Sequence, residues 1–248
     1  MGTMLQPRMS LPPSTSPVAP EFDQFAGDYD AALNAGLKFS GEAKEFFAEN
    51  RVKWLKRRLG EALKPARRCL DYGCGTGTAT PYLMETLGLA QLTGVDLSEE
   101  SLAMARKDHG SPLVSFQHLD TLQDLRDVFD LGYCNGVFHH IPPAERPGCA
   151  ASIFRAMKPG ATFALWENNA WNPMVRFIMS RVPFDADAIM LFPGEARRLM
   201  RDAGFEVMGT DFLFVFPAAL APLRVVEPAL CKLPLGGQYQ VLCRKPMH

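Results

Sequence analysis

The chain has 248 residues, of which 47% are hydrophobic and 21% are charged, and its formal net charge is −1. That length is enough for one α/β domain with a well-buried core. A charge this close to zero argues against binding of nucleic acid, which normally requires a strongly basic face. The local basic run at residues 51–58 is interpreted as the solvated face of a helix.

The six cysteines show no C-x-x-C pairing, and three of them lie in apolar, strand-like runs: Cys69, Cys134 and Cys243. A free cysteine in such a run behaves as a small hydrophobic residue, whereas a zinc site or a disulfide framework needs clustered spacing. No basic segment followed by an apolar core marks a secretory signal, and the apolar run 212–223 is too short to span a membrane. We therefore expect a reduced, cytoplasmic protein with no metal site and no membrane partner.

The N-terminal part of the chain divides into a tail and two helices. Residues 1–20 contain five prolines with scattered serines, which predicts a disordered tail. The pattern changes at Glu21, and residues 21–248 are predicted to form a single domain. A short helix is expected at 21–36 and a longer amphipathic helix at 41–63.

Strand-like and helix-like segments alternate from residue 67 onward. Helical segments separate five apolar strands, which we expect at 67–73, 91–98, 113–120, 129–138 and 162–169. Such alternation predicts right-handed βαβ units and a parallel sheet that is covered on both faces.

The regular alternation ends after the fifth strand. Residues 170–193 are predicted to form a helix and a loop that cover the substrate. A helix at 194–205 with a stop at Gly204 restores the pattern. The last two strands are expected at 205–216 and 238–245, with a proline-containing helical segment between them.

A glycine-rich loop follows the first strand, and an acid ends the second. Asp71-x-Gly73-x-Gly75-x-Gly77 lies where ligands bind to open parallel sheets, and Asp96 is suitably placed for ribose hydroxyls. The glycines let the backbone approach a ligand, and the next helix N-terminus offers N–H groups. The spacing is not the G-x-G-x-x-G of dinucleotide loops, and Asp71 would repel a pyrophosphate. The predicted ligand has a ribose and a positive charge but no phosphate.

Five motifs in order resemble those of the class I S-adenosylmethionine-dependent methyltransferases. They are LDYGCGTG, GVDLS, FQHLD, GYCNGVFHHIPP and MKPGATFAL, in which Ala161 replaces the usual second glycine. The resemblance extends over residues 21–246. It implies a doubly wound, Rossmann-like α/β fold whose seven-stranded sheet is mostly parallel with an antiparallel last strand, and it implies S-adenosylmethionine as the cofactor.

The resemblance also implies which residues contact the cofactor. Asp71 would face the methionine amino group, Asp96 would hold the ribose hydroxyls, and Asp120 would accept a hydrogen bond from the adenine amino group. The other implied contacts are Gly73, Cys74, Gly75, Gly77, Leu97, Thr121, Asn135 and Gly136. Tyr29 stands in the place of an N-terminal aromatic residue that closes over the cofactor; the alternative is that it packs a helix.

Methyl transfer from a sulfonium requires the enzyme to align a nucleophile and to exclude water. A hydroxyl nucleophile also needs a base, and histidine is best tuned for that role near neutral pH. His139 and His140 follow the fourth strand, and only one is expected to enter the pocket because neighbours in an extended chain point in opposite directions. The resemblance implies His139 as the base, paired with Glu167 at the end of the fifth strand. The alternatives are a structural His139 and a Glu167 that caps a helix or binds substrate; a structural role is favoured for His140.

Aromatic and amide side chains around the fifth strand suit a polyhydroxylated or cyclic small molecule. Candidate substrate contacts are His140, Asn168, Asn169 and Trp171, whereas Trp166 is expected to face the core. The alternative is that the asparagines make turns. The predicted activity is methylation of a hydroxyl oxygen on a sugar or natural product. An N-methyltransferase, or a protein that binds the cofactor without catalysis, remains an alternative.

Overall fold

The structure is a computed structural model that describes residues 41–60, 67–180 and 188–247. The predicted tail, the predicted helix at 21–36 and Tyr29 lie outside the described residues, as does the loop part 181–187 of the predicted substrate cover.

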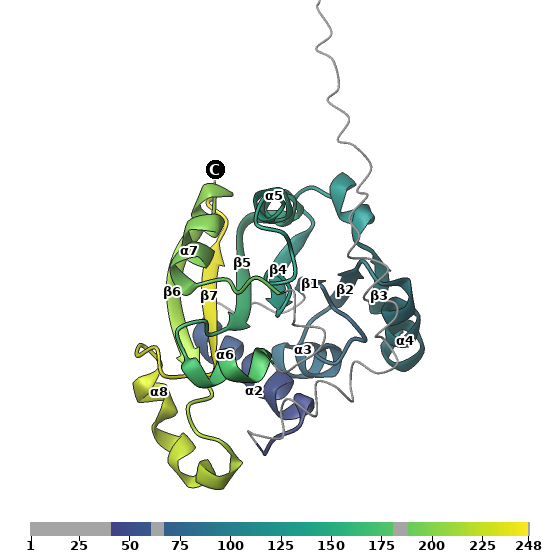
Figure 1. The fold of residues 1–248 in the computed structure, drawn as a ribbon. Helices are drawn as coiled ribbons and strands as arrows, with labels where there is room; N and C mark the ends of the chain where they lie inside the picture. Colours follow the sequence, from purple (N-terminus) through teal and green to yellow (C-terminus); the bar gives the residue numbers. More distant parts are fainter. Residues whose placement is uncertain (1–40, 61–66, 181–187, 248) are drawn as a thin grey trace, which may run out of the picture.

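Seven strands of the described residues form one sheet in the order β3-β2-β1-β4-β5-β7-β6 (Figure 1). The first five pair in parallel, and β7 runs antiparallel between β5 and β6. Their bounds are β1 Arg68–Tyr72, β2 Gln91–Asp96, β3 Val114–His118, β4 Phe129–Asn135, β5 Met157–Asn168, β6 Glu206–Leu213 and β7 Gln238–Arg244. The predicted sheet is confirmed. Its order reverses between β1 and β4, so the carboxyl ends of these two strands form the crevice where such sheets bind ligands.

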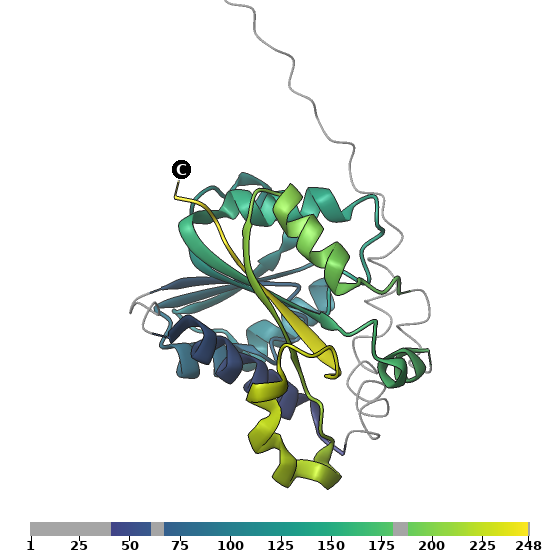
Figure 2. The same cartoon turned by 90° about the vertical axis from the view of Figure 1, so that its left-hand side faces the viewer.

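Helices cover both faces of the sheet (Figure 2). Helices α2 (Lys44–Leu59), α3 (Thr80–Leu87) and α4 (Glu99–His109) pack their apolar sides on one face. The other face is covered by α5 (Arg146–Ala156), α7 (Pro193–Asp202) and the 3₁₀ helix η2 (Leu119–Asp124). Alternate residues of each buried strand enter the two cores, which is why the strands read as continuous apolar runs in the sequence.

Local signals in the sequence set some of these boundaries. Ser98 caps α4, and its Oγ accepts a hydrogen bond from the N–H of Ser101 at 3.1 Å. Helix α5 ends at Ala156, and β5 begins directly at Met157 and contains Pro159. The pairing with β4 is irregular between Phe129 and Leu131, and this irregularity accommodates the proline.

Shorter helices lie between the last strands. Helix α6 (Pro173–Met179) is the helical part of the predicted 170–193 segment, and η4 (Ala218–Val226) and α8 (Glu227–Leu230) form the proline-containing connection to β7. None of the helices that the structure describes is both long and apolar enough to cross a membrane.

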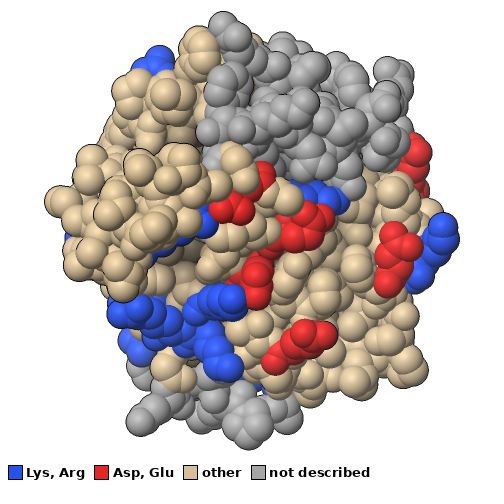
Figure 3. Space-filling view, turned by 90° about the horizontal axis from the view of Figure 1, so that it is seen from below, with Lys and Arg blue, Asp and Glu red and all other residues tan. Residues whose placement is uncertain are grey.

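The basic run in α2 is not wholly solvated. Lys53, Lys56, Arg57 and Arg58 are exposed. Figure 3 shows basic side chains with acidic side chains next to them on a largely uncharged face. The guanidinium of Arg51, however, is buried beneath the helix, where apolar residues would be expected. Its helical position, one residue before the buried Val52, faces the sheet rather than water.

Candidate active site

The glycine loop uses its N–H groups within the protein. Gly73 and Cys74 donate to the carbonyl oxygen of Val95 at 2.8 and 3.1 Å, and Gly77 donates to that of Cys74 at 2.9 Å. Gly75 donates to Asp96 Oδ2 at 2.8 Å. A phosphate loop would instead aim these groups at its ligand. The loop therefore serves a ligand by leaving room beside its backbone, which agrees with the prediction of a ligand without phosphate.

Two glycines of this loop differ in what lies beside them. At Gly73, with φ of +71°, an added Cβ would lie 2.2 Å from Val137 Cγ2, so the loop packs directly on the turn that follows β4. At Gly75, with φ of +51°, an added Cβ would meet nothing within 4 Å. The space beside Gly75 is thus open, whereas the space beside Gly73 is filled.

Asp96 ends β2 with a carboxylate that is partly occupied. Its Oδ2 accepts from Gly75 and its Oδ1 accepts from the N–H of Ser98 at 3.0 Å. A carboxylate has about four acceptor positions, so capacity for two ribose hydroxyls remains. Burial raises the pKa of Asp96, while the backbone hydrogen bonds from Ser98 and Gly75 act in the opposite direction. Leu97, half-buried, follows directly at the same edge.

Asp71 is the most unusual acid of the site. Its side chain is 1% exposed, and its Oδ2 has no hydrogen-bond partner in the part of the chain that the structure describes. Burial, and then the charge of Asp96, raise its pKa to about 7, while Arg51 acts in the opposite direction. A buried carboxyl oxygen without a partner is costly unless a ligand supplies one. Asp71 therefore fits the ammonium end of the predicted cofactor.

Asp120 and Thr121 lie in the first turn of η2, next to the end of β3. Asp120 is exposed, and its Oδ2 lies 3.2 Å from His118 Nδ1. Thr121 Oγ1 donates to the carbonyl oxygen of His118 at 2.8 Å. His118 pairs with Asp96 in the sheet, so this turn lies beside the predicted ribose position. Contact with an adenine remains a prediction.

The two histidines lie in a turn and not in an extended chain. β4 ends at Asn135, and the N–H of His140 donates to the carbonyl oxygen of Val137 at 3.0 Å. The two imidazole rings consequently lie side by side, with centroids 4.1 Å apart. The expectation that they point in opposite directions was wrong, because it assumed that the chain stays extended after the strand. His139 is buried and His140 is half-buried.

Glu167 holds this turn and the ring of His139. Its side chain is buried, and its Oε1 accepts from the N–H groups of Val137 at 3.1 Å and Phe138 at 2.7 Å. Its Oε2 lies 2.6 Å from His139 Nδ1. In the neutral ring this contact places the proton on Nδ1 and leaves Nε2 as the basic nitrogen. The predicted His139–Glu167 juxtaposition is thus present, and Glu167 binds the turn rather than capping a helix.

Sequence reasoning missed a buried arginine beside this turn. Arg146, in the first turn of α5, donates from Nε to the carbonyl oxygen of Ile141 at 2.9 Å and from Nη2 to that of Ile189 at 2.5 Å. The N–H of Ile189 in turn donates to the carbonyl oxygen of His139 at 2.9 Å. Arg146 therefore ties the histidine turn to the last part of the predicted substrate cover. A cation in a first helical turn, where acids are favoured, was the available signal.

The predicted contact Asn169 and the nearby Asn172 both belong to the scaffold. Asn169 is fully buried, and its Nδ2 donates to the carbonyl oxygens of Pro234 at 3.1 Å and Gly236 at 2.8 Å. Asn172 caps α6 through an acceptor contact with the N–H of Met174 at 3.0 Å. The alternative that asparagines make turns holds for both residues, because their amide groups are used by the backbone.

The remaining predicted contacts differ in exposure. Asn168 is half-buried, and its Oδ1 accepts from Gln238 Nε2 at 3.4 Å. Trp171 is 46% exposed and stacks on Phe212. Trp166 is fully buried, as expected. Asn135 and Gly136 end β4 beside Glu167 and His139, where the N–H of Gly136 donates to the carbonyl oxygen of Trp166 at 2.9 Å.

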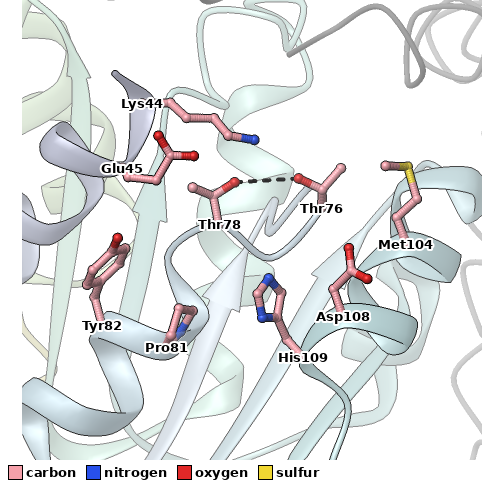
Figure 4. Close-up of a pocket in the computed structure, with 9 residues that line it drawn as sticks. All are labelled: Lys44, Glu45, Thr76, Thr78, Pro81, Tyr82, Met104, Asp108 and His109. Carbon is pink, nitrogen blue, oxygen red and sulfur yellow. Dashed lines mark hydrogen bonds between the residues drawn. The ribbon is translucent and has the colours of Figure 1, made fainter. Parts of the chain in front are cut away.

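A hollow of about 190 Å³ lies on the outer side of the glycine loop (Figure 4). Thr76 and Thr78 point into it from the loop, and the rest of its lining comes from the starts of α2 and α3 and from α4: Lys44, Glu45, Pro81, Tyr82, Met104, Asp108 and His109. Asp71, Asp96 and His139 are not among its lining residues, although Thr76 directly follows Gly75 in the glycine loop. Among the described residues, no cluster of three or more His, Cys, Asp or Glu side chains could hold a metal ion.

The sheet order, the glycine loop and the two terminal acids point to one family. Residues 70–165 match the model of the methyltransferase domain family. The matched part of the chain runs from β1 into β5. A solved S-adenosylmethionine-dependent methyltransferase from Thermotoga maritima has the same fold, with a TM-score of 0.62 and 18% identity over 92% of this chain and 99% of that one. The class I methyltransferase fold and family resemblance predicted from the sequence are confirmed.

Relatives of the methyltransferase domain differ in the atom they methylate. The O-methyltransferase cnsE of Penicillium expansum is 27% identical over 62% of this chain and 58% of its own length. The N-demethylindolmycin N-methyltransferase of Streptomyces griseus is 28% identical over 45% of this chain and 48% of its own. The chain thus spans about half the length of these curated relatives.

Proposed function

We propose that the protein transfers a methyl group from S-adenosylmethionine to a hydroxyl oxygen of a small molecule, such as a sugar or a natural product, with His139 as the general base. The observation that carries this proposal is the 2.6 Å contact between His139 Nδ1 and Glu167 Oε2, directly after β4. A carboxylate in this position orients the imidazole and stabilises its protonated form.

The described residues fit the cofactor at three places. The unpartnered carboxyl oxygen of Asp71 would bind its ammonium group, the remaining acceptor positions of Asp96 would bind its ribose hydroxyls, and the open space beside Gly75 would receive it. Leu97, Asp120 and Thr121 would then border the adenine, with Asn135 and Gly136 beside the methionine part. When bound, S-adenosylmethionine supplies an already activated methyl group.

The protein's own part in the reaction is to orient the acceptor and to take its proton. His139 Nε2 would accept the proton of the acceptor hydroxyl, and Glu167 would stabilise the resulting imidazolium. The proton would pass to water after the product leaves. Buried surroundings strengthen the interaction of the imidazolium with Glu167. His140, Asn168 and Trp171 are the proposed substrate contacts; Asn169 is given none, because its amide is used within the fold.

A second candidate function is N-methylation of a small amine. It is favoured by the similarity to the N-methyltransferase of Streptomyces griseus. An amine brings its own lone pair, so His139 would position it without acting as a base. Binding of the cofactor without catalysis is the third candidate, and any turnover would exclude it.

The test is release of S-adenosylhomocysteine with a panel of glycosides, phenols, carboxylic acids and amines. We expect turnover with hydroxyl acceptors, and a loss of kcat of roughly 10²–10⁴-fold in His139→Ala with the affinity for S-adenosylhomocysteine retained. His140→Ala is the matched variant in the same turn and should affect KM more than kcat. Turnover confined to amines would discard the base, and a near-normal kcat in His139→Ala would do the same.

A further inference from the structure

A buried cation lies under α2 without an acidic hydrogen-bond partner among the contacts that hold it. Arg51 is 7% exposed. Its Nε donates to the hydroxyl of Tyr133 at 3.1 Å, and its Nη1 donates to Gln238 Oε1 at 2.9 Å. Both acceptors are neutral, although a buried guanidinium is normally balanced by a carboxylate at hydrogen-bond distance. The charge of Arg51 must therefore be balanced by an acid slightly farther away.

The sheet register indicates which acid this is. Asp71 on β1 pairs with Tyr133 on β4, and Cys69 and Tyr133 belong to the core beneath α2. Asp71 is two residues beyond Cys69, so its side chain lies on the same face of the sheet. Arg51, bound to the hydroxyl of Tyr133, is thus on the face where the carboxyl group of Asp71 is buried.

The charges around Asp71 leave Arg51 as its cationic neighbour. Burial and Asp96 raise the pKa of Asp71, and Arg51 is the cation that lowers it. The other titratable groups that sense the charge of Asp71 come from β1, the glycine loop and β4: Cys69, Cys74, Tyr133 and Cys134. Burial raises the pKa of each of these four groups, so they are neutral near pH 7 and do not offset Asp96.

We infer that Arg51 is a positioning residue for cofactor binding: its charge, held against Tyr133 under the sheet, keeps Asp71 in the carboxylate form that receives an ammonium group. The inference rests on the proposed function, because it concerns the cofactor of that same site. Arg51 itself need not touch the cofactor. It acts on Asp71 from the α2 side of the sheet, while the ligand approaches from the carboxyl edge.

This arrangement predicts a particular pH dependence. Protonation of Asp71 removes the partner of the ammonium group, so the affinity for an amino-acid-bearing ligand should fall as the pH drops below about 7. Without Arg51 the carboxyl would hold its proton to higher pH, and the fall should begin at higher pH. A ligand with the same adenosine part but no ammonium group should not respond.

The experiment is calorimetric titration from pH 5.5 to 9 with S-adenosylhomocysteine and with 5′-methylthioadenosine, which lacks the amino acid part. For Arg51→Met we expect about fivefold weaker binding of S-adenosylhomocysteine at pH 7 and less than twofold at pH 9, as for a midpoint moved up by about one pH unit. Binding of 5′-methylthioadenosine should be unchanged. Arg51→Lys, which keeps the charge, should restore most of the affinity.

Lys53→Met is the matched control, because Lys53 lies on the same helix, is exposed and pairs with Glu49 at the surface. It should bind both ligands as the wild type does.

An equal loss for both ligands in Arg51→Met, or a loss that does not vary with pH, would show that Arg51 is only part of the scaffold. If Arg51→Met does not fold, the same comparison is made with Arg51→Lys and with Arg51→Lys/Asp71→Asn, in which the pH dependence should vanish. Absence of S-adenosylhomocysteine binding by the wild-type protein would instead overturn the proposed function.

Discussion

The two buried acids at the carboxyl edge of the sheet differ in how completely the protein satisfies them. Glu167 accepts two backbone N–H groups and contacts His139, so each of its oxygens has a partner. Asp71 is equally buried, yet its Oδ2 has none among the described residues. The histidine turn is therefore pre-organised in the free protein, as catalytic groups should be. The proposed cationic ligand would supply the partner that Asp71 lacks.

The two regions are nevertheless in direct contact. Gly73 packs so closely on Val137 that no side chain fits between them, and Val137 is one of the two residues whose N–H groups Glu167 holds. A ligand that settles beside the glycine loop therefore borders the turn that carries His139. Methyl transfer requires this closeness, because the donor and the base must reach the same acceptor atom.

The largest effect on stability should follow from removal of Glu167. Glu167→Ala leaves two buried N–H groups and a histidine without their acceptor, which should cost about 3–5 kcal/mol of unfolding free energy. Glu195→Ala is the matched control, because Glu195 is exposed and accepts one N–H, that of Phe192; it should cost about 1 kcal/mol. Urea unfolding measures both. Equal losses would show that Glu167 is not the anchor of the turn.

Asp71→Asn should stabilise the free protein, whereas Glu167→Ala should destabilise it. The pKa of Asp71 is raised to about 7 in the folded protein, so folding favours its protonated form. The free protein should therefore lose stability as the pH rises from about 4 to about 7. Removing the charge should then stabilise the free protein by on the order of 2–4 kcal/mol at pH 8 and hardly at all at pH 4.

The same variant should bind S-adenosylhomocysteine about 10-fold to 100-fold more weakly at pH 8, because the charged acceptor is lost. Urea unfolding at the two pH values and calorimetry provide the two measurements. A variant that is destabilised at pH 8 would mean that Asp71 is already satisfied in the free protein, and the contrast with Glu167 would disappear.

The contrast between these regions was only partly readable from the sequence. Strand and helix positions follow from apolar periodicity, and the glycine loop with Asp71 and Asp96 follows from spacing, so the fold and the cofactor edge could be predicted. The histidine turn could not, because the end of β4 is set by the hydrogen bonds of Val137 and Phe138 to a residue 30 and 29 positions away. Long-range contacts of this kind leave no local signal.

The buried arginines show the same limit. A run of basic residues in α2 predicts a solvated face, and four of its members are indeed exposed. Arg51 is buried because strands β4 and β7 supply Tyr133 and Gln238 as acceptors, and these lie 82 and 187 residues away. Arg146 is likewise explained by carbonyl oxygens on two separate segments. Such positions become visible only when the topology is known.

Two glycines of the loop should differ in whether a substitution affects stability or ligand binding. Gly73→Ala would place a Cβ 2.2 Å from Val137 Cγ2 and should cost about 2–3 kcal/mol of stability. Gly75→Ala meets nothing within 4 Å and should cost only about 1 kcal/mol, for its positive φ. The affinity for S-adenosylhomocysteine should instead fall more in Gly75→Ala than in Gly73→Ala, because the Cβ added at residue 75 would occupy the space proposed for the ligand. An unchanged affinity in Gly75→Ala would contradict that placement of the ligand.

Asp120→Asn should have the smallest effect on stability, because Asp120 is exposed and, unlike Glu167, is not held by buried hydrogen bonds. Its side chain is 67% exposed and its contact with His118 is at the surface, so the substitution should change the stability of the free protein by less than about 0.5 kcal/mol. If Asp120 accepts the adenine amino group, the affinities for S-adenosylhomocysteine and 5′-methylthioadenosine should fall together, by roughly 2-fold to 10-fold. Asp124→Asn, at an exposed position in the same 3₁₀ helix, is the control. If Asp120→Asn and Asp124→Asn bind both ligands equally well, Asp120 is not part of the site. A loss for both ligands in Asp120→Asn alone would indicate an adenine contact, because loss of the ammonium contact of Asp71 should affect only S-adenosylhomocysteine.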